Sequence, residues 1–204
     1  MDEKTKLKYV YYDQILPVGH KFKEIKFKFN EHKFRFLTDV GMFARFEIDT
    51  GTKFLLRNLD AKTDDTFLDL CCGYGVVGIT AGKFCRSVVM SDVNERAIEM
   101  VKRNLELNLV TNAKVVNSDL FENIPDKWTI IATNPPLRAG IEFMKKLVVG
   151  AKAHLHNNGR IFIVARKKQN AYKIFEILGE NFDAKIVEKG GGYVVMKGIN
   201  KINP

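Results

Sequence analysis

Residues 66–78 read TFLDLCCGYGVVG and contain the most informative pattern of the sequence. An apolar run that ends at Asp69 passes into a glycine-rich turn and then into an apolar segment that suits a helix. Glycines at 73, 75 and 78 leave no Cβ where a ligand would approach the backbone. The helix that follows turns its free N–H groups and the positive end of its dipole toward the same place. The stretch therefore predicts a strand, a tight loop and a helix that together bind a nucleotide-like ligand.

Predicted strands and helices alternate after this loop. Such alternation predicts an α/β fold, in which a mostly parallel sheet carries helices on both faces. The run Gly190-Gly191-Gly192 predicts a hairpin, so the last strand is expected to be antiparallel to the strand before it. The predicted strands cover residues 66–71, 87–91, 113–117, 128–133, 160–165, 184–188 and 193–197, and the predicted helices cover residues 76–85, 94–108, 139–154 and 168–178.

A smaller unit precedes this alternation. Between residues 25 and 36, apolar and basic residues alternate around a polar turn, which predicts a β-hairpin with an aromatic underside and a basic outer face. A short lead-in helix follows, capped by Asp49 or Thr50. We therefore expect a small N-terminal extension of hairpin and helix over residues 1–60 and a cofactor-binding domain over residues 61–204.

Length and composition fit one domain with an appendage, since the chain has 204 residues of which 46% are hydrophobic. No apolar run approaches the roughly 20 residues that span a bilayer, and the charged start lacks the apolar core of a secretory signal. We expect a cytoplasmic protein without a membrane partner, present as a monomer or a weak homo-oligomer. Three cysteines and no His or Cys cluster with metal-ligand spacing predict neither a disulfide framework nor a metal site.

The positive charge is concentrated in one part of the chain. Of the net charge of +9, residues 138–173 carry nine Lys or Arg against one Glu. Such a local excess favours a polyanionic partner such as RNA, because Lys and Arg neutralise phosphates. Solvated helix faces are the alternative explanation. The candidate RNA contacts are the basic residues expected at the rim of the site, namely Arg138, Arg166, Lys167 and Lys168.

Three acidic residues follow or end predicted strands, where open α/β sheets bind their ligands. Asp69 ends the first strand, Asp92 ends the second, and Asp119 follows the third. A carboxylate after the second strand can accept hydrogen bonds from both ribose hydroxyls, and Asp119 could accept one from an adenine amino group. Each acid alone could be a helix cap or turn residue. Their common placement beside the glycine loop indicates an adenosine-containing cofactor.

The fourth strand of the parallel run ends in Asn134-Pro135-Pro136-Leu137. Two prolines remove two backbone donors and stiffen the turn, which leaves the Asn134 amide and the Pro135 carbonyl as acceptors in a fixed array. Such an array can hold a planar NH2 group so that its nitrogen lone pair points at an electrophilic methyl group. A simple strand-ending turn is the alternative.

From about residue 34 to residue 198 the chain resembles the class I S-adenosylmethionine-dependent methyltransferases of the small-domain group. The resemblance is strongest to the ribosomal RNA guanine-N2 methyltransferases and their short archaeal homologues. It implies a Rossmann-like methyltransferase fold and S-adenosylmethionine as cofactor. The stretches that carry it are FLTDVGMF, IDTGTKFLL, LDLCCGYGVVG, SDVNERAIEM, NSDLFENI, TNPPLRAG and GGYVVMKG.

The resemblance also implies roles for individual residues. In this family the glycine loop and the acid after the second strand hold the cofactor, the acid after the third strand lies by adenine, and the Asn-Pro-Pro turn holds the target amine. The corresponding cofactor residues are Asp69, Cys72, Gly73, Gly75, Asp92, Asp119 and Asn134, and the corresponding catalytic residues are Asn134, Pro135 and Pro136.

The chain departs from the family pattern at two positions. Cys71 stands where the first glycine of the loop is usual, which has a cost if the backbone there adopts a positive φ. Leu137 stands where relatives often carry an aromatic residue that stacks on the target base. Many ribosomal relatives carry an additional N-terminal domain, so recognition here is expected from the lead-in region, the basic stretch or a partner.

The predicted function is therefore an enzyme that moves a methyl group from S-adenosylmethionine to an exocyclic amine. Guanine N2 in ribosomal or other structured RNA is the favoured acceptor, and a base inside a helix would first have to be flipped out. Adenine N6 or a protein glutamine amide are alternatives. A nicotinamide dehydrogenase, which shares the G-x-G-x-x-G loop, and a non-catalytic RNA-binding protein are further alternatives.

Overall fold

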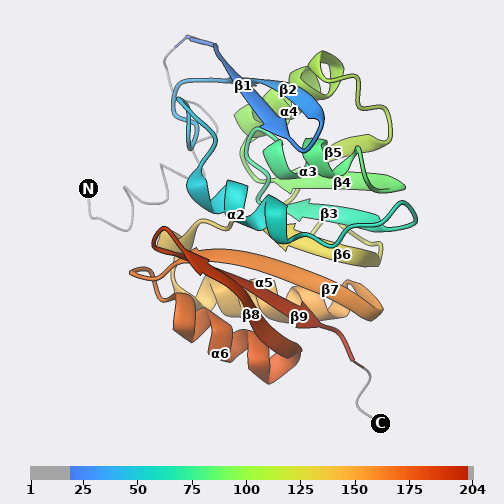
Figure 1. Cartoon of the computed structure of the whole chain (residues 1–204), viewed down its shortest axis with the longest axis vertical. Helices are drawn as coiled ribbons and strands as arrows, with labels where there is room; N and C mark the ends of the chain where they lie inside the picture. Colours follow the sequence, from blue (N-terminus) through green and yellow to red (C-terminus); the bar gives the residue numbers. More distant parts are fainter. Residues whose placement is uncertain (1–18, 202–204) are drawn as a thin grey trace.

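The computed structural model describes residues 19–201, and its centre is a seven-stranded sheet (Figure 1). The strand order is β5-β4-β3-β6-β7-β9-β8, and all neighbours are parallel except β9, which is antiparallel to β7 and to β8. The predicted α/β fold with an antiparallel last strand is thereby confirmed. The strands are β3 Thr66–Leu70, β4 Ser87–Asp92, β5 Ala113–Asn117, β6 Trp128–Thr133, β7 Leu155–Arg166, β8 Asp183–Gly190 and β9 Tyr193–Ile199.

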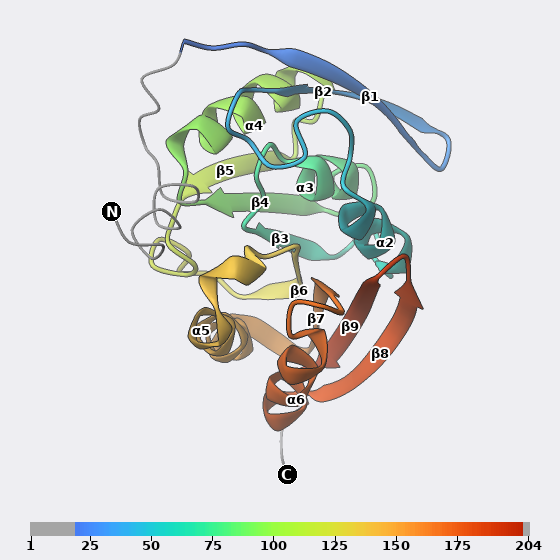
Figure 2. The same cartoon turned by 90° about the vertical axis from the view of Figure 1, so that its left-hand side faces the viewer.

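Helices cover both faces of this sheet (Figures 1 and 2). Successive strand residues point to opposite sides, so both faces are apolar and both are buried under helices. Phe67 and Ile130 belong to a core cluster with α2, α3 and α4, whereas Leu68 and Ile131 belong to a second cluster with α5 and α6. The helices are α2 Thr50–Asn58, α3 Val76–Ala81, α4 Glu95–Leu107, α5 Ile141–Ala153 and α6 Ala171–Asn181, with a 3-10 turn η1 Leu137–Ala139 before α5.

The differences from the predicted elements lie at their ends. The helix predicted for residues 76–85 ends at Ala81, before Gly82. The helix predicted from residue 168 begins at Ala171, because Asn170 adopts a left-handed conformation with a φ of 60° that cannot continue a helix. Helix α2 is capped by Asp49, whose Oδ2 accepts a hydrogen bond from the Thr52 N–H, as one of the two expected caps. No helix within residues 19–201 is long and apolar enough to cross a membrane.

The predicted hairpin is present as a separate two-stranded antiparallel sheet of β1 Lys23–Phe29 and β2 His32–Thr38. Its Ile25, Phe34 and Phe36 side chains are buried in the core cluster that also contains α2, α3 and α4. The lysines and arginine of its other face are exposed. The hairpin and α2 thus share a core with the sheet, and the domain boundary after residue 60 stays a prediction.

Asn104 in α4 and Asn108, the C-cap residue of this helix, attach the hairpin by hydrogen-bonding to the backbone of β2 as a neighbouring strand would. The buried Asn104 side chain accepts a hydrogen bond from the Leu37 N–H at 2.7 Å and donates to the carbonyls of Leu37 and Tyr74, both at 2.9 Å. One turn later, Asn108 makes the same pair of bonds with the backbone of Arg35. Side-chain amides carry both a donor and an acceptor, so they can satisfy the unpaired edge of β2.

We expect Asn104→Ala to lower the free energy of unfolding by about 2–4 kcal/mol, because it leaves the buried Tyr74 carbonyl and part-buried backbone groups of Leu37 without partners. Urea unfolding measures this change. Asn108→Ala is the matched control, since its bonds to Arg35 lie at an exposed position and should contribute about 1 kcal/mol or less. Equal small losses in both variants would contradict the role of Asn104.

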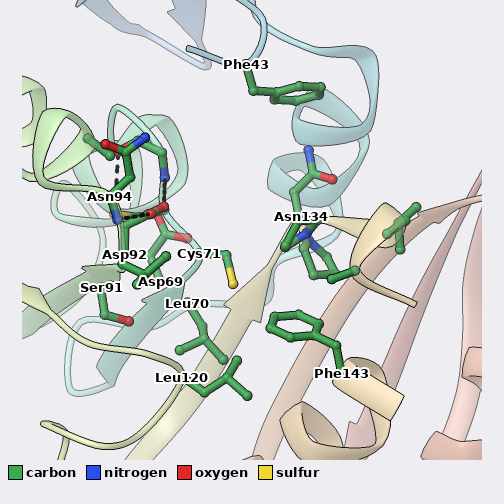
Figure 3. A pocket seen from close by; sticks show the side chains of 18 of the residues that line it. Phe43, Asp69, Leu70, Cys71, Ser91, Asp92, Asn94, Leu120, Asn134 and Phe143 are labelled. Carbon is green, nitrogen blue, oxygen red and sulfur yellow. Dashed lines mark hydrogen bonds between the residues drawn. The ribbon is translucent and has the colours of Figure 1, made fainter. Parts of the chain in front are cut away.

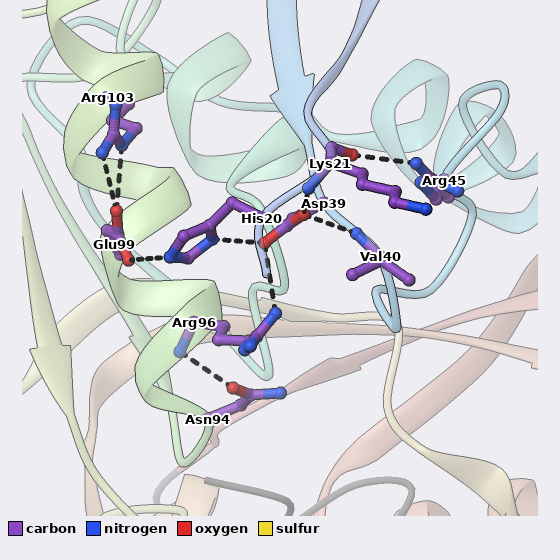
Figure 4. A network of polar contacts seen from close by, with 9 residues as sticks. All are labelled: His20, Lys21, Asp39, Val40, Arg45, Asn94, Arg96, Glu99 and Arg103. Carbon is purple, nitrogen blue, oxygen red and sulfur yellow. Dashed lines mark hydrogen bonds and ion pairs between the residues drawn. The ribbon is translucent and has the colours of Figure 1, made fainter. Parts of the chain in front are cut away.

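A buried carboxylate fastens both ends of the hairpin to the start of α4 (Figure 4). Asp39 accepts hydrogen bonds from the Lys21 and Val40 N–H groups at 2.8 and 2.7 Å, and its other oxygen lies 2.7 Å from His20 Nδ1 and 3.3 Å from Arg96 Nη1. Burial alone would raise the pKa of Asp39, but the bonds from His20, Lys21 and Val40 outweigh it and hold the pKa below its ordinary value. This network also anchors the loop that leads from β2 to α2.

Candidate active site

A pocket of about 1290 Å³ opens beyond the carboxyl ends of the central strands (Figure 3). The chain runs from β3 outward to β5 and then returns to β6 on the other side of β3, and such a reversal point is where open α/β sheets bind ligands. The volume exceeds the roughly 300–1,000 Å³ of a pocket for one ligand, so a cofactor and an acceptor fit together. The predicted site residues that line it are Asp69, Cys72, Gly73, Asp92, Asp119, Asn134, Pro135, Pro136, Arg138 and Arg166.

The glycine loop presents its backbone to this pocket. Gly73 has a φ of 54°, and a Cβ added there would meet no atom within 4 Å, so the loop borders open space. Cys71 also has a positive φ, of 61°. A non-glycine residue in this conformation carries a cost of about 1–2 kcal/mol, so the replacement of the usual glycine strains this loop. Gly75 directly precedes α3 and does not line the pocket.

Asp69 lines the inner part of the pocket and also supports the glycine loop through α3. Its carboxylate is 1% exposed and accepts a hydrogen bond from the Gly78 N–H in α3 at 2.8 Å. Burial raises the pKa of Asp69 to about 8, and the bond from Gly78 offsets only part of this effect. In the folded protein the Asp69 side chain therefore stays protonated at neutral pH.

This raised pKa predicts a pH dependence of stability. The folded-state pKa of about 8 lies above the ordinary value of 3.8. The contribution of Asp69 to the free energy of unfolding is therefore fully present at low pH and is lost as the pH rises from about 4 through about 8. Asp69→Asn removes the titration and keeps an oxygen for the Gly78 N–H. Urea unfolding from about pH 4 to pH 9 should show the variant gaining on the parent protein as pH rises. Parallel profiles of the two proteins would refute the assignment.

The end of β4 supplies groups that fit an adenosine cofactor. Asp92 Oδ2 accepts a hydrogen bond from the Gly73 N–H at 2.9 Å, and Oδ1 accepts one from the Asn94 N–H at 3.0 Å. Each carboxylate oxygen keeps a further lone pair, which suits the two hydroxyls of a ribose. Beside it, the buried Ser91 Oγ has no hydrogen-bond partner among the described residues. The open Gly73 backbone, the Asp92 carboxylate and this hydroxyl together fit such a group.

The cysteines of the loop do not supply a nucleophile. Burial raises the pKa of the Cys71 and Cys72 thiols well above the ordinary value, and the neighbouring Asp92 and Asp69 carboxyls raise it further. Both thiols therefore stay protonated near neutral pH. Within residues 19–201 no group of three His, Cys, Asp or Glu side chains could hold a metal ion.

The Asn134 amide is held in one orientation by helix α2. Its Nδ2 donates hydrogen bonds to Thr52 Oγ1 at 3.0 Å and to Asp49 Oδ2 at 3.2 Å. A carboxylate accepts and cannot donate, so the NH2 end of the amide must face Asp49. Oδ1 of Asn134 is therefore the end left for a ligand. The sequence predicts only a capping role for Asp49, and no local pattern marks its contact with a residue 85 positions later.

The same carboxylate connects α2 with the far strands. The Tyr193 hydroxyl donates a hydrogen bond to Asp49 Oδ1 at 3.0 Å, and Arg166 Nε donates to the Tyr193 oxygen at 2.9 Å. Burial and the bond to Asp49 raise the pKa of Tyr193, so its hydroxyl stays protonated. A Cβ on Gly51 would lie 2.7 Å from the Tyr193 ring, so only glycine permits this approach. The sequence did not reveal Thr52 or Tyr193 as members of the site.

The predicted RNA contacts divide into two groups. Arg138 and Arg166 line the pocket, and Arg166 is partly engaged with Tyr193 and Asp49. Lys167 and Lys168 are exposed in the turn after β7 and lie outside the pocket lining. The pocket thus has two arginines at its border and two lysines in an adjoining turn.

Residues 33–197 match the family model described as methyltransferase small domain. One relative, described as uncharacterized protein YbxB of Bacillus subtilis, is 36% identical over 193 residues, which cover 92% of this chain and 96% of that protein. Ribosomal RNA small subunit methyltransferase C of Haemophilus influenzae is 34% identical over 163 residues, which cover 76% of this chain and 48% of that protein.

Among solved structures, the chain is similar to the T. thermophilus 16S rRNA N2 G1207 methyltransferase (RsmC) in complex with AdoMet and guanosine. The TM-score is 0.81 at 22% identity, with 88% of this chain and 51% of that chain covered, so the likeness concerns the fold. The chain spans about half the length of the methyltransferase C relatives that it matches.

Proposed function

We propose that the N2 amine of a guanine in ribosomal RNA is the acceptor of this chain, which belongs to the methyltransferase small domain family and is an S-adenosylmethionine-dependent methyltransferase. The observation that carries the proposal is the fixed amide of Asn134, whose NH2 end is held by Asp49 and Thr52. An amide fixed in this way offers an acceptor to an exocyclic amine. The names of the methyltransferase C relatives support ribosomal RNA as the acceptor.

The residues of this chain bind and orient the reactants. Asp92 and the Gly73 backbone would hold the adenosine part of the cofactor, and Asp119 borders the same pocket. When bound, S-adenosylmethionine supplies a methyl group already activated by its sulfonium charge. Asn134 Oδ1 and the Pro135 carbonyl would accept the two hydrogens of the target amine and so direct its lone pair. An amide is no base near neutral pH, so the proton would leave after transfer.

The direct test compares modified nucleosides by mass spectrometry. Ribosomal RNA from cells with and without the gene would be digested, and purified enzyme with labelled S-adenosylmethionine would be incubated with the RNA from the deletion strain. We expect N2-methylguanosine to fall in the deletion strain and to reappear with label. Label in N6-methyladenosine, or in protein and not RNA, would replace the guanine proposal with one of its alternatives.

We expect the double substitution Lys167→Gln and Lys168→Gln to weaken RNA binding and flatten its salt dependence. Each lost phosphate contact reduces the slope of log affinity against log salt by roughly 0.7–0.9, because fewer counterions are released. The matched control is Lys114→Gln with Lys185→Gln, two exposed lysines on the edge strands β5 and β8. If both double variants bind RNA with the same slope, the lysines after β7 are only a solvated surface.

A further inference from the structure

Two phenylalanine rings lie open to solvent in the loop between β2 and α2. Phe43 is 59% exposed and Phe46 is 68% exposed, whereas the phenylalanines of the hairpin underside are buried or half-buried. Burying such a ring would remove a large apolar area from water, so exposed aromatic pairs mark binding surfaces. Phe43 also lines the pocket. Phe43 therefore lies where a ligand would enter the active site, and Phe46 follows three residues later in the same loop, outside the pocket lining.

Cations surround the outer ring of this pair. Lys23 Nζ lies 4.5 Å from the centroid of the Phe46 ring, and the Arg45 guanidinium carbon lies 5.4 Å from it. Aromatic rings flanked by Lys and Arg are typical of sites for single-stranded nucleic acids, because bases stack on the rings while phosphates meet the cations. A purely apolar partner would leave these two charges buried without counter-charges.

The loop that carries the rings is held in place by hydrogen bonds. The Thr38 hydroxyl donates to the Arg45 carbonyl at 2.9 Å, and the Tyr74 hydroxyl, from the glycine loop, donates to the Ala44 carbonyl at 3.2 Å. Asp39 anchors the start of the loop through the contacts drawn in Figure 4. Rings on a fixed backbone lose little conformational freedom when a ligand stacks on them.

The Asn-Pro-Pro turn itself offers no aromatic ring, because residues 134–137 are Asn-Pro-Pro-Leu. Figure 3 draws Phe43 on the Asn134 side of the pocket, with Asp92 and Asn94 on the other side. A base whose amine reaches Asn134 would therefore lie on the side where the Phe43 ring is offered. The loop before α2 can thus supply the aromatic surface that the turn lacks.

We propose that Phe43 stacks on the target base and that Phe46, beneath Lys23 and Arg45, receives a neighbouring unpaired nucleotide of the substrate RNA. This proposal rests on the RNA acceptor of the proposed function and adds how that RNA is bound. Because every base has a π-face, such a surface binds unstacked nucleotides whatever their sequence. Paired bases inside a duplex keep their faces covered, so the surface selects single-stranded or flipped-out positions.

The test measures the affinity of purified full-length variants for a short single-stranded RNA of mixed sequence and for the same RNA annealed to its complement. The variants are Phe43→Ala, Phe46→Ala and Phe43→Trp. Phe22→Ala is the matched control, since Phe22 is 44% exposed under Arg103 at 5.0 Å but does not line the pocket. Calorimetry with S-adenosylmethionine measures the cofactor site separately.

Each alanine variant should lose roughly 5- to 150-fold in affinity for the single strand, with little change for the duplex. Phe43→Trp and Phe22→Ala should bind the single strand like the parent protein, and cofactor affinity should stay unchanged throughout. The proposed stacking surface would be wrong if the alanine variants bind the single strand as the Phe22 control does. It would also be wrong if they lose affinity equally for the single strand and the duplex. A loss of cofactor affinity would assign Phe43 to the cofactor instead. These outcomes do not depend on which base is methylated.

Discussion

Replacing Asn134 by alanine is expected to lower kcat by at least ~100-fold, because we propose that positioning of the reacting amine supplies much of the acceleration. The cofactor is already activated, so loss of the orienting acceptor cannot be compensated by the methyl donor. Affinity for S-adenosylmethionine should stay within a few-fold of that of the parent protein. Single-turnover methyl transfer measures the first effect, and calorimetry with the cofactor measures the second.

The structure changes the expected result for a second substitution at this position. From the sequence, Asn134→Asp should retain some activity, because a carboxylate keeps an acceptor. In the structure the amide donates to Asp49 and Thr52, so an aspartate would place two carboxylates against each other and lose both donors. We therefore expect the aspartate variant to be nearly as impaired as the alanine variant at neutral pH.

Thr52→Val is the graded control for this mechanism. It removes one of the two acceptors that hold the Asn134 amide and conserves the shape of a side chain that is 7% exposed. An intermediate loss of kcat with unchanged cofactor affinity is expected. Full activity of Asn134→Ala would end the amine-orienting hypothesis, and loss of cofactor binding in that variant would make Asn134 a cofactor residue.

Asp92→Ala should weaken S-adenosylmethionine binding by at least ~100-fold, since two charge-assisted hydrogen bonds to ribose hydroxyls contribute about 1.5–3 kcal/mol each. The protein should still fold. Burial raises the pKa of Asp92, and its bonds from the Asn94 and Gly73 N–H groups only partly compensate, so its removal also removes a desolvation cost. Calorimetry gives the affinity, and Glu95→Ala, an exposed charge change in the first turn of α4, is the control.

A cofactor analogue separates contact with the ribose from support of the loop, because Asp92 also accepts a hydrogen bond from the Gly73 N–H. The parent protein should bind the 2′-deoxy analogue more weakly than S-adenosylmethionine, and Asp92→Ala should lose this discrimination. If the variant still discriminates, Asp92 acts on the loop and not on the ribose. If it binds the cofactor as tightly as the parent protein, Asp92 has neither role.

Much of this fold follows from patterns that are local in the sequence. The alternation of Phe27 and Phe34 with basic neighbours predicts a hairpin, because strand side chains point alternately to two faces. The turn from Leu70 to Gly75 predicts a strand, a loop and a helix, because glycine and the chain direction limit the backbone there. Helix ends are harder to predict, since the left-handed backbone conformation of Asn170, where α6 begins, depends on its surroundings as much as on its residue type.

The class of the protein, its glycine loop and the Asn-Pro-Pro turn, for which we propose amine binding, follow from the sequence alone, because each depends on residues that are neighbours along the chain. Which end of the Asn134 amide faces the pocket depends instead on tertiary contacts with Asp49 and Thr52, which lie 85 and 82 positions earlier. Tertiary contacts also place Phe43 at the border of the pocket and Asn104 against the edge of β2. Hydrogen bonds and ring contacts of this kind form between elements that folding brings together, and no period of the sequence records them.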